Sequence, residues 1–349
     1  MTIPHAEILM GVGGTLVLAG TLWPRWGLLA WWRSARRRAR RHHIEDALKH
    51  LYESELNGAP ASVQTVAFAT QLSGDQVAGV LQDVERHGLV EQQGDEIHLT
   101  PAGRELGLHV LRAHRLWESY LADRTGFPET EWHGRAHDLE HGLSAADVDA
   151  LAARLHHPTH DPHGDPIPTA AGESAEPTGI PLAKAAVGEA LRIVHIEDEP
   201  DAVYAQLVAT GLYPGMVVEL RQVSPSEVRL ASAIGEHVIE PLAAANVAVV
   251  TVQRDPAIET SRGQSLAVLR PGESGRVTNL APRCRGAERR RLMDLGVLPG
   301  TVIRAEIRSP SGDPTAYWIR GALIALRTEQ ADMIWIERVP TGTTAEAAA

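Results

Sequence analysis

The chain has 349 residues, 44% of them hydrophobic, and a formal net charge of -11. This length predicts two or three domains with their own hydrophobic cores, and the negative charge argues against a protein that coats nucleic acid non-specifically. The single cysteine, Cys284, excludes a disulfide framework and is typical of a reducing compartment.

The N-terminal segment is apolar and ends in a cluster of arginines. The stretch from Ile3 to Trp23 has the roughly 20 residues that a membrane-spanning helix needs. A second apolar stretch ends at Trp32, and six arginines follow it: Arg33, Arg36, Arg37, Arg38, Arg40 and Arg41. Positive residues remain on the cytoplasmic side, so residues 1–41 predict a single-pass anchor in the cell membrane, with the C-terminal domains in the cytoplasm. An interfacial amphipathic helix is the alternative.

Residues 42–104 have the pattern of a winged helix-turn-helix. A helix is expected over residues 44–56, two short helices over 62–72 and 73–87, and two strands around a turn over 89–99. The second short helix offers hydrogen-bonding side chains for DNA: Ser73, Gln76, Gln82 and Arg86. Its acidic residues Asp75, Asp83 and Glu85 oppose contact with phosphate, so DNA binding is expected to be weak and salt-sensitive.

Histidines and carboxylates mark the next region, residues 105–160. Helices are expected over 100–121, 131–143 and 145–155. The i, i+3 and i+4 spacing places His133, His137, Glu140 and His141 on one helical face, and His114 and Glu118 lie one turn apart. Imidazole and carboxylate donors without a thiolate suit Fe(II), Mn(II) or Zn(II). A solvated, histidine-rich helix is the alternative.

The C-terminal half contains an internal repeat. Residues 161–181, rich in proline and glycine, predict a linker. Residues 206–215 and 291–300 then share the frame Leu-x-x-x-Gly-φ-x-Pro-Gly, where φ is apolar, and β-type residues follow each copy. Two small β-barrels in tandem, over residues 182–254 and 262–339, explain this repeat best.

Residues 42–168 resemble the diphtheria toxin repressor family of metal-dependent transcriptional regulators. The resemblance rests on several short motifs: Asp46 to Tyr52, Ser73-Gly74, Leu99 to Gly103, His114 to Glu118, His137 to Ser144, His157-Pro158 and Gly164 to Pro168. The two C-terminal modules each resemble the SH3-like FeoA domain. The resemblance therefore implies an α+β chain: an N-terminal transmembrane helix, a winged helix, a helical dimerisation domain and two SH3-like barrels.

The resemblance also implies two metal sites. The primary site would use Asp46, His137, Glu140 and His141. The ancillary site would use His114, Glu118 and His133, completed by an acidic residue from the cluster Glu197, Asp198, Glu199 and Asp201. Lys49 stands where some manganese-responsive members have a glutamate, so the identity of the metal stays open.

Two functions fit this sequence. The first is a membrane-anchored, homodimeric regulator of iron or manganese homeostasis that binds DNA when loaded with Fe(II) or Mn(II), with Zn(II) as a possible ligand. The second is a membrane-bound metal sensor that acts on a metal transporter through its FeoA-like domains without binding DNA. An enzyme is not expected, because the chain has no phosphate loop and no nucleophile paired with a base.

Overall fold

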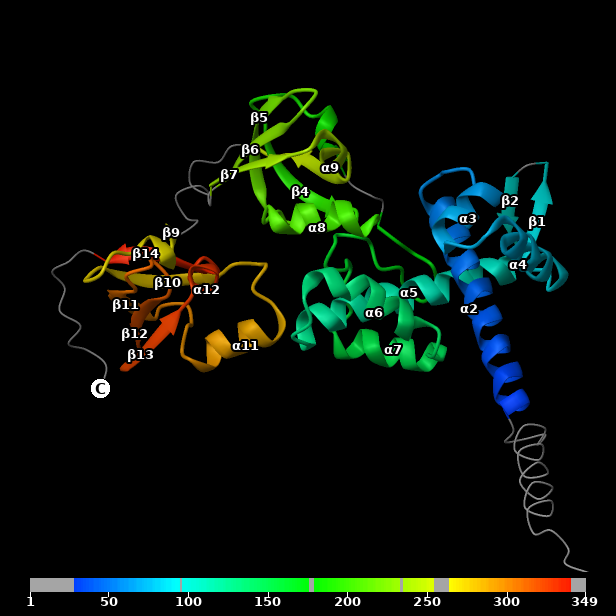
Figure 1. Ribbon diagram of the computed structural model, residues 1–349, viewed down its shortest axis with the longest axis horizontal. Coiled ribbons are helices and arrows are strands. Elements are labelled where there is room, and N and C mark those ends of the chain that lie inside the picture. Colours follow the sequence, from blue (N-terminus) through cyan, green and yellow to red (C-terminus); the bar gives the residue numbers. More distant parts are fainter. Residues whose placement is uncertain (1–27, 95, 176–178, 233–234, 254–263, 340–349) are drawn as a thin grey trace, which may run out of the picture. The chain divides into compact units, whose positions relative to one another are not determined.

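The computed structural model describes residues 28–94, 96–175, 179–232, 235–253 and 264–339 (Figure 1). The chain divides into two compact units. The first contains residues 1–113 and 140–145, and the second contains residues 114–139 and 146–349. The fold is α+β, as expected: helices dominate the N-terminal half, and two antiparallel sheets follow.

The first unit contains a winged helix. Its elements are α2 (Leu28–Leu56), α3 (Val63–Thr70), α4 (Gly74–Arg86), β1 (Val90–Gln93) and β2 (Glu96–Leu99). Ser62 caps α3, and the backbone N–H of Ser73 donates to the Gln76 side chain at 3.0 Å at the start of α4. Gly88, with φ of 65°, ends α4 in the left-handed conformation that glycine favours. Leu48, Leu51, Val66, Val77 and Val84 form the core.

Helix α2 differs from the expected one. It is continuous over 29 residues and includes all six arginines of the N-terminal cluster, whereas a helix starting near residue 44 was predicted. No helix in the described part of the chain is long and apolar enough to cross a membrane. The apolar run behind the membrane prediction, Ile3 to Trp23, lies outside the described residues.

The helical region connects the two units. It consists of α5 (Pro101–Arg124), η1 (Glu129–Glu131), α6 (Trp132–Glu140) and α7 (Ala145–Arg154). Helix α6 is shorter than predicted: it ends at Glu140, and His141 lies in the turn that follows. Thr100 caps α5 by accepting the Gly103 N–H at 3.2 Å.

Two six-stranded sheet modules complete the second unit. The first β-module contains β3 (Ile180–Pro181), η2 (Leu182–Lys184), β4 (Ala190–Ile196), α8 (Asp201–Ala209), β5 (Val217–Val223), β6 (Val228–Ser232), β7 (Gly235–Ile239), α9 (Pro241–Ala245) and β8 (Val247–Thr251). The second β-module contains β9 (Gln264–Ser265), η3 (Leu266–Val268), β10 (Ser274–Leu280), α11 (Gly286–Asp294), β11 (Val302–Arg308), β12 (Thr315–Ile319), β13 (Ala322–Leu326), α12 (Thr328–Ala331) and β14 (Ile334–Val339).

The two β-modules have the same topology. Their strand orders, β3-β8-β4-β5-β6-β7 and β9-β14-β10-β11-β12-β13, correspond strand for strand. The last glycine of the repeated frame has the same conformation in both modules, because Gly215 and Gly300 each have φ near 90°. The N–H of each donates at 2.7 Å to a carbonyl oxygen of the first long strand of its module, that of Ile193 and that of Val277 respectively. The repeated sequence frame therefore corresponds to a repeated structural unit.

Candidate metal centre

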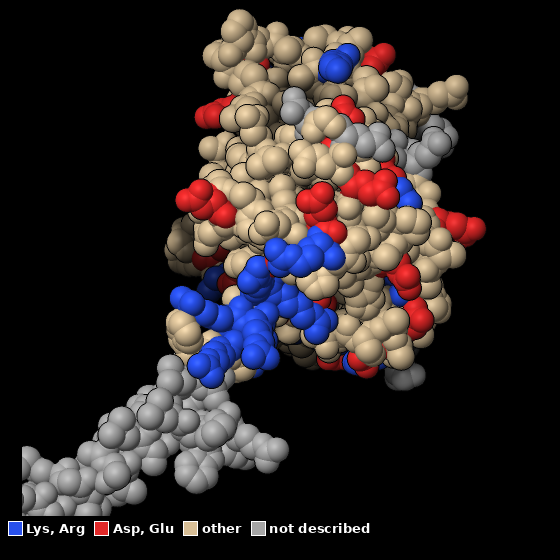
Figure 2. Space-filling view, turned by 90° about the vertical axis from the view of Figure 1, so that its right-hand side faces the viewer, with Lys and Arg blue, Asp and Glu red and all other residues tan. Residues whose placement is uncertain are grey.

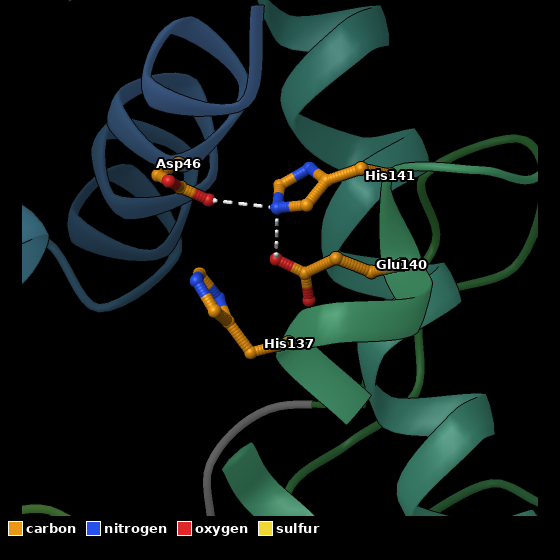
Figure 3. A group of neighbouring side chains, drawn as sticks. All are labelled: Asp46, His137, Glu140 and His141. Carbon is orange, nitrogen blue, oxygen red and sulfur yellow. Dashed lines mark ion pairs between the residues drawn. The ribbon is translucent and has the colours of Figure 1, made fainter. Parts of the chain in front are cut away.

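Four side chains form the first cluster of possible metal ligands. Asp46 lies on α2, His137 and Glu140 lie one turn apart on α6, and His141 follows that helix (Figure 3). Each offers a ligand atom, and these atoms lie within 4.8 Å of one another. The His141 Nε2 atom is 3.3 Å from Asp46 Oδ1 and 3.7 Å from Glu140 Oε1. This set of two imidazoles and two carboxylates suits a divalent first-row ion.

A second layer of charged groups orients these ligands. His141 shares a hydrogen bond of 2.8 Å between its Nδ1 and Glu45, which leaves Nε2 directed at the cluster. Arg41 donates to Glu45 at 2.6 Å. Burial alone would lower the pKa of His141, but its contacts with Asp46 and Glu45 raise it to about 9.

Lys49 pairs with one of the ligands. Its ammonium lies 3.1 Å and 3.2 Å from the two carboxylate oxygens of Glu140, whose side chain is fully buried. Burial lowers the pKa of Lys49, and the Glu140 carboxylate more than reverses this effect. Lys49 therefore stays charged and neutralises Glu140, as a bound cation would.

The second cluster is centred on Glu118 of α5. The Glu118 Oε1 atom is 3.0 Å from His114 Nε2 and 3.2 Å from His133 Nδ1. His133, although on the same helix as His137, thus belongs to a different cluster. Its Nδ1 also lies 2.7 Å from Asp198, which belongs to the acidic group singled out in the sequence.

His163 joins the second cluster, although its sequence position did not predict a ligand there. Its Nδ1 atom lies 3.3 Å from Asp198 and 3.7 Å from Glu118, and these three residues form a third possible ligand group. Asp161 and His163 lie at the start of the predicted linker, and both side chains are buried. The Asp161 carboxylate accepts the N–H groups of His163, Gly164 and Asp165 at 2.9 to 3.0 Å and so fixes the loop.

The electrostatics of the second cluster favour a cation. Burial would lower the pKa of each histidine, but neighbouring carboxylates raise that of His133 to about 12 and that of His163 to about 10. Burial raises the pKa of Glu118, but His114, followed by His163 and His133, holds it well below its ordinary value. The Nε2 atom of His163 is buried without a hydrogen-bond partner in the described part of the chain, whereas Nδ1 faces the carboxylates of Asp198 and Glu118.

Comparison with known proteins decides the family. The chain is 30% identical over 193 residues to the iron-dependent repressor IdeR of Mycobacterium leprae, and the match covers 51% of this chain and 83% of that protein. It belongs to the diphtheria toxin repressor family. The diphtheria toxin repressor of Corynebacterium diphtheriae is likewise 30% identical over 185 residues, which cover 50% of this chain and 81% of the repressor.

Two domain families match separate parts of the chain. Residues 100–169 match the iron dependent repressor, metal binding and dimerisation domain, and residues 264–338 match the FeoA domain. A solved manganese-dependent transcriptional repressor in complex with manganese is 26% identical, with a TM-score of 0.55 over 60% of this chain and all of that one. The family consists of transcriptional repressors, so the expectation that the chain is not an enzyme is confirmed.

The predicted DNA-contacting side chains of this family member lie on α4 and at its start. Ser73, Gln76, Gln82 and Arg86 are all exposed. Of the three acidic residues expected to repel phosphate, Asp83 is buried. Its carboxylate forms ion pairs with Arg86, at 3.1 Å, and with Arg40 of α2. Asp75 and Glu85 are exposed. The surface of α4 is therefore less acidic than the sequence suggests.

Proposed function

We propose that the chain is a divalent-metal-dependent transcriptional regulator of iron or manganese homeostasis that binds DNA as a homodimer. The observation that carries this proposal is the first cluster, because Asp46 belongs to the same helix, α2, that packs in the winged helix. A single ion held by Asp46 and by the ligands around α6 would favour one arrangement of the DNA-binding helices. Membership in a family of metal-dependent repressors supports the same conclusion.

Fe(II) or Mn(II) is the proposed ligand, and Zn(II) is expected to bind more tightly in vitro. Asp46, His137, Glu140 and His141 would hold the regulatory ion, and a second ion would bind around Glu118 with His114, His133, His163 and Asp198. The first β-module is proposed as a second FeoA domain because its strand order equals that of the matched one.

Calorimetry tests the first site. Replacing Glu140 and His141 with alanine should remove one bound Mn(II) per chain. The matched control is Glu105→Ala with His156→Ala, which removes an exposed glutamate and an exposed histidine outside both clusters. Unchanged stoichiometry in the Glu140 and His141 variant would contradict the assignment.

A footprint on the region upstream of the protein's own gene tests DNA binding. At low salt and saturating Mn(II) we expect protection that a chelator abolishes. Gln82→Ala should weaken it by about 1–3 kcal/mol, the usual value of a base contact, and Gln206→Ala on α8 should not. Gln82 is preferred to Gln76, whose side chain caps α4. Absence of protection at any salt, with co-purification of a metal transporter, would favour the sensor without DNA binding.

We also propose that residues 5–32 anchor the protein in the cell membrane, with the C-terminal domains in the cytoplasm. The support is the sequence alone: an apolar run followed by arginines. Membranes washed with carbonate should retain the full-length chain. Its release into the soluble fraction, or cleavage of the C-terminal domains by protease outside intact cells, would contradict the anchor.

A further inference from the structure

The arginines at the start of α2 lie on a helix face that continues into the core of the winged helix. Arg33, Arg37 and Arg40 are spaced by four and three residues, and the same spacing continues through the core residues Ile44, Leu48 and Leu51. The first turns of α2 therefore extend the side of the helix that packs against α3 and α4.

Asp46 and Arg38 lie on other sides of the helix. Asp46 is two residues from both Ile44 and Leu48, so it projects roughly opposite to them. Arg38 is two residues from both Arg36 and Arg40 and is likewise separated from them. The metal ligand and the arginine face thus occupy different sides of the same helix.

An ion pair joins the arginine face to α4. Arg40 donates to the buried Asp83 carboxylate in the last turn of α4, and its own side chain is 63% exposed. Arg33, Arg36, Arg37 and Arg40 are exposed, and Figure 2 shows basic side chains gathered where α2 begins. We call these four residues the arginine stripe.

The stripe retains an unneutralised charge. Arg40 pairs with Asp83, and the Arg36 guanidinium lies 3.8 Å from the centre of the Trp32 ring. Within the described residues, Arg33 and Arg37 form no ion pair. Two exposed guanidinium groups on the side of α2 that continues toward α4 are complementary to phosphate.

The geometry points to a second DNA contact: the arginine stripe binds backbone phosphates beside the base pairs contacted by α4. This inference rests on the proposed DNA binding and adds the element that compensates for Asp75 and Glu85. An anionic lipid surface has the same phosphate chemistry. DNA is favoured because the stripe lies on the face of α2 that is tied to α4 through Arg40 and Asp83.

The salt dependence of DNA binding by arginine variants tests the proposed phosphate contact. Full-length protein in detergent, loaded with Mn(II), is titrated with a duplex from its own upstream region over a range of salt concentrations. Each lost phosphate contact should reduce the slope of log K against log salt by about 0.9, so Arg33→Gln with Arg37→Gln should reduce it by about 1.8 for each bound protomer, or about 3.6 for the homodimer. The affinity at low salt should fall on the order of tenfold.

Arg38→Gln is the control for Arg37→Gln, because it removes the same charge from the adjacent residue on another side of α2. Arg37→Gln should lower the salt slope and Arg38→Gln should not. If the two variants change the salt slope equally, or if neither changes it, the proposed phosphate contact by the stripe is wrong. Thermal unfolding of each variant checks that the fold is intact.

Two further outcomes are decisive. If the wild type binds the duplex in a Mn(II)-dependent way and the double variant binds equally well, the proposed phosphate contact by the stripe is wrong and the proposed function stands. If the wild type binds no DNA, both fail. Binding to phosphatidylglycerol vesicles that is lost in the double variant, while DNA binding persists, would assign the stripe to lipid instead.

Discussion

At the scale of single residues, Glu45 has a role that differs from ligation. It hydrogen-bonds Nδ1 of His141 and so leaves Nε2 for the ion, an arrangement that supports many metal-bound histidines. Glu45→Gln should lower Mn(II) affinity at this site by about 10- to 100-fold without changing the stoichiometry. Calorimetry measures both. Glu55→Gln, on an exposed part of the same helix, is the control, and equal affinities of the two variants would exclude the positioning role.

The raised histidine pKa values predict how metal binding depends on pH. A free histidine loses its proton near pH 6.5, but the pKa of His141 is about 9 and that of His163 about 10. Since a ligand must be deprotonated, Mn(II) affinity should keep rising from pH 6.5 to 9. Calorimetry in buffers of different ionisation enthalpy should detect released protons at pH 7.5. An affinity that is constant above pH 7.5 would contradict this expectation.

The metal-free protein should show the opposite trend. A histidine whose pKa is higher in the folded than in the unfolded chain stabilises the fold fully below pH 6.5, and that contribution is lost as the pH rises through the folded value. His141 should therefore make the metal-free chain less stable between pH 6.5 and 9. Thermal unfolding in the presence of a chelator measures this, and a His141→Gln variant should show a smaller decline.

The spacing of residues in the sequence predicted the metal ligands that lie on regular helices, but it did not predict His163 in the loop around Asp161. His137 and Glu140 lie one turn apart on one helix, so their proximity follows from helical periodicity. The periodicity could not show that His133, on the same helix, belongs with Glu118 and Asp198. His163 was missed because its position depends on the turn around Asp161; the histidine between two Asp residues was the one available signal.

At the scale of elements, Gly107 allows α5 to approach α2 closely. A Cβ at this position would lie 2.6 Å from the Leu48 carbonyl oxygen and 2.9 Å from the Tyr52 Cβ atom. Gly107→Ala should therefore destabilise the first unit by about 1–3 kcal/mol, the usual cost of overpacking. Gly79→Ala in α4 has open space and should be neutral or stabilising by up to about 1 kcal/mol. Calorimetric unfolding compares the two, and equal stabilities would contradict close packing at Gly107.

The continuity of α2 could not be read from composition. The change from aromatic and apolar residues to arginines suggested a boundary near residue 41, yet arginine and alanine both favour helix and no glycine or proline interrupts Leu28–Leu56. The β-modules were easier to predict from the sequence. The Leu-x-x-x-Gly-φ-x-Pro-Gly frame places two glycine turns between a helix and a strand in each copy. Repetition thus predicted topology better than a change in composition predicted a boundary.

At the scale of the whole molecule, metal binding should stabilise the chain through two separate sites. An ion at 100 times its dissociation constant contributes about 2.7 kcal/mol to stability. Asp46 belongs to the first cluster and Asp198 to the second, and the two share no partner among the contacts described above. Asp46→Asn and Asp198→Asn should each remove part of the increase in unfolding free energy that Mn(II) provides. The two reductions should add in the double variant.

Thermal unfolding with Mn(II) and with a chelator measures these gains. Asp201→Asn is the control, because Asp201 is exposed on α8 only three residues after Asp198 and contributes to neither cluster. It should keep the full gain. Loss of the whole gain in either single variant would show that the sites bind cooperatively. Loss in neither variant would show that these carboxylates do not hold the metal, because removing a ligand must weaken binding to the folded state.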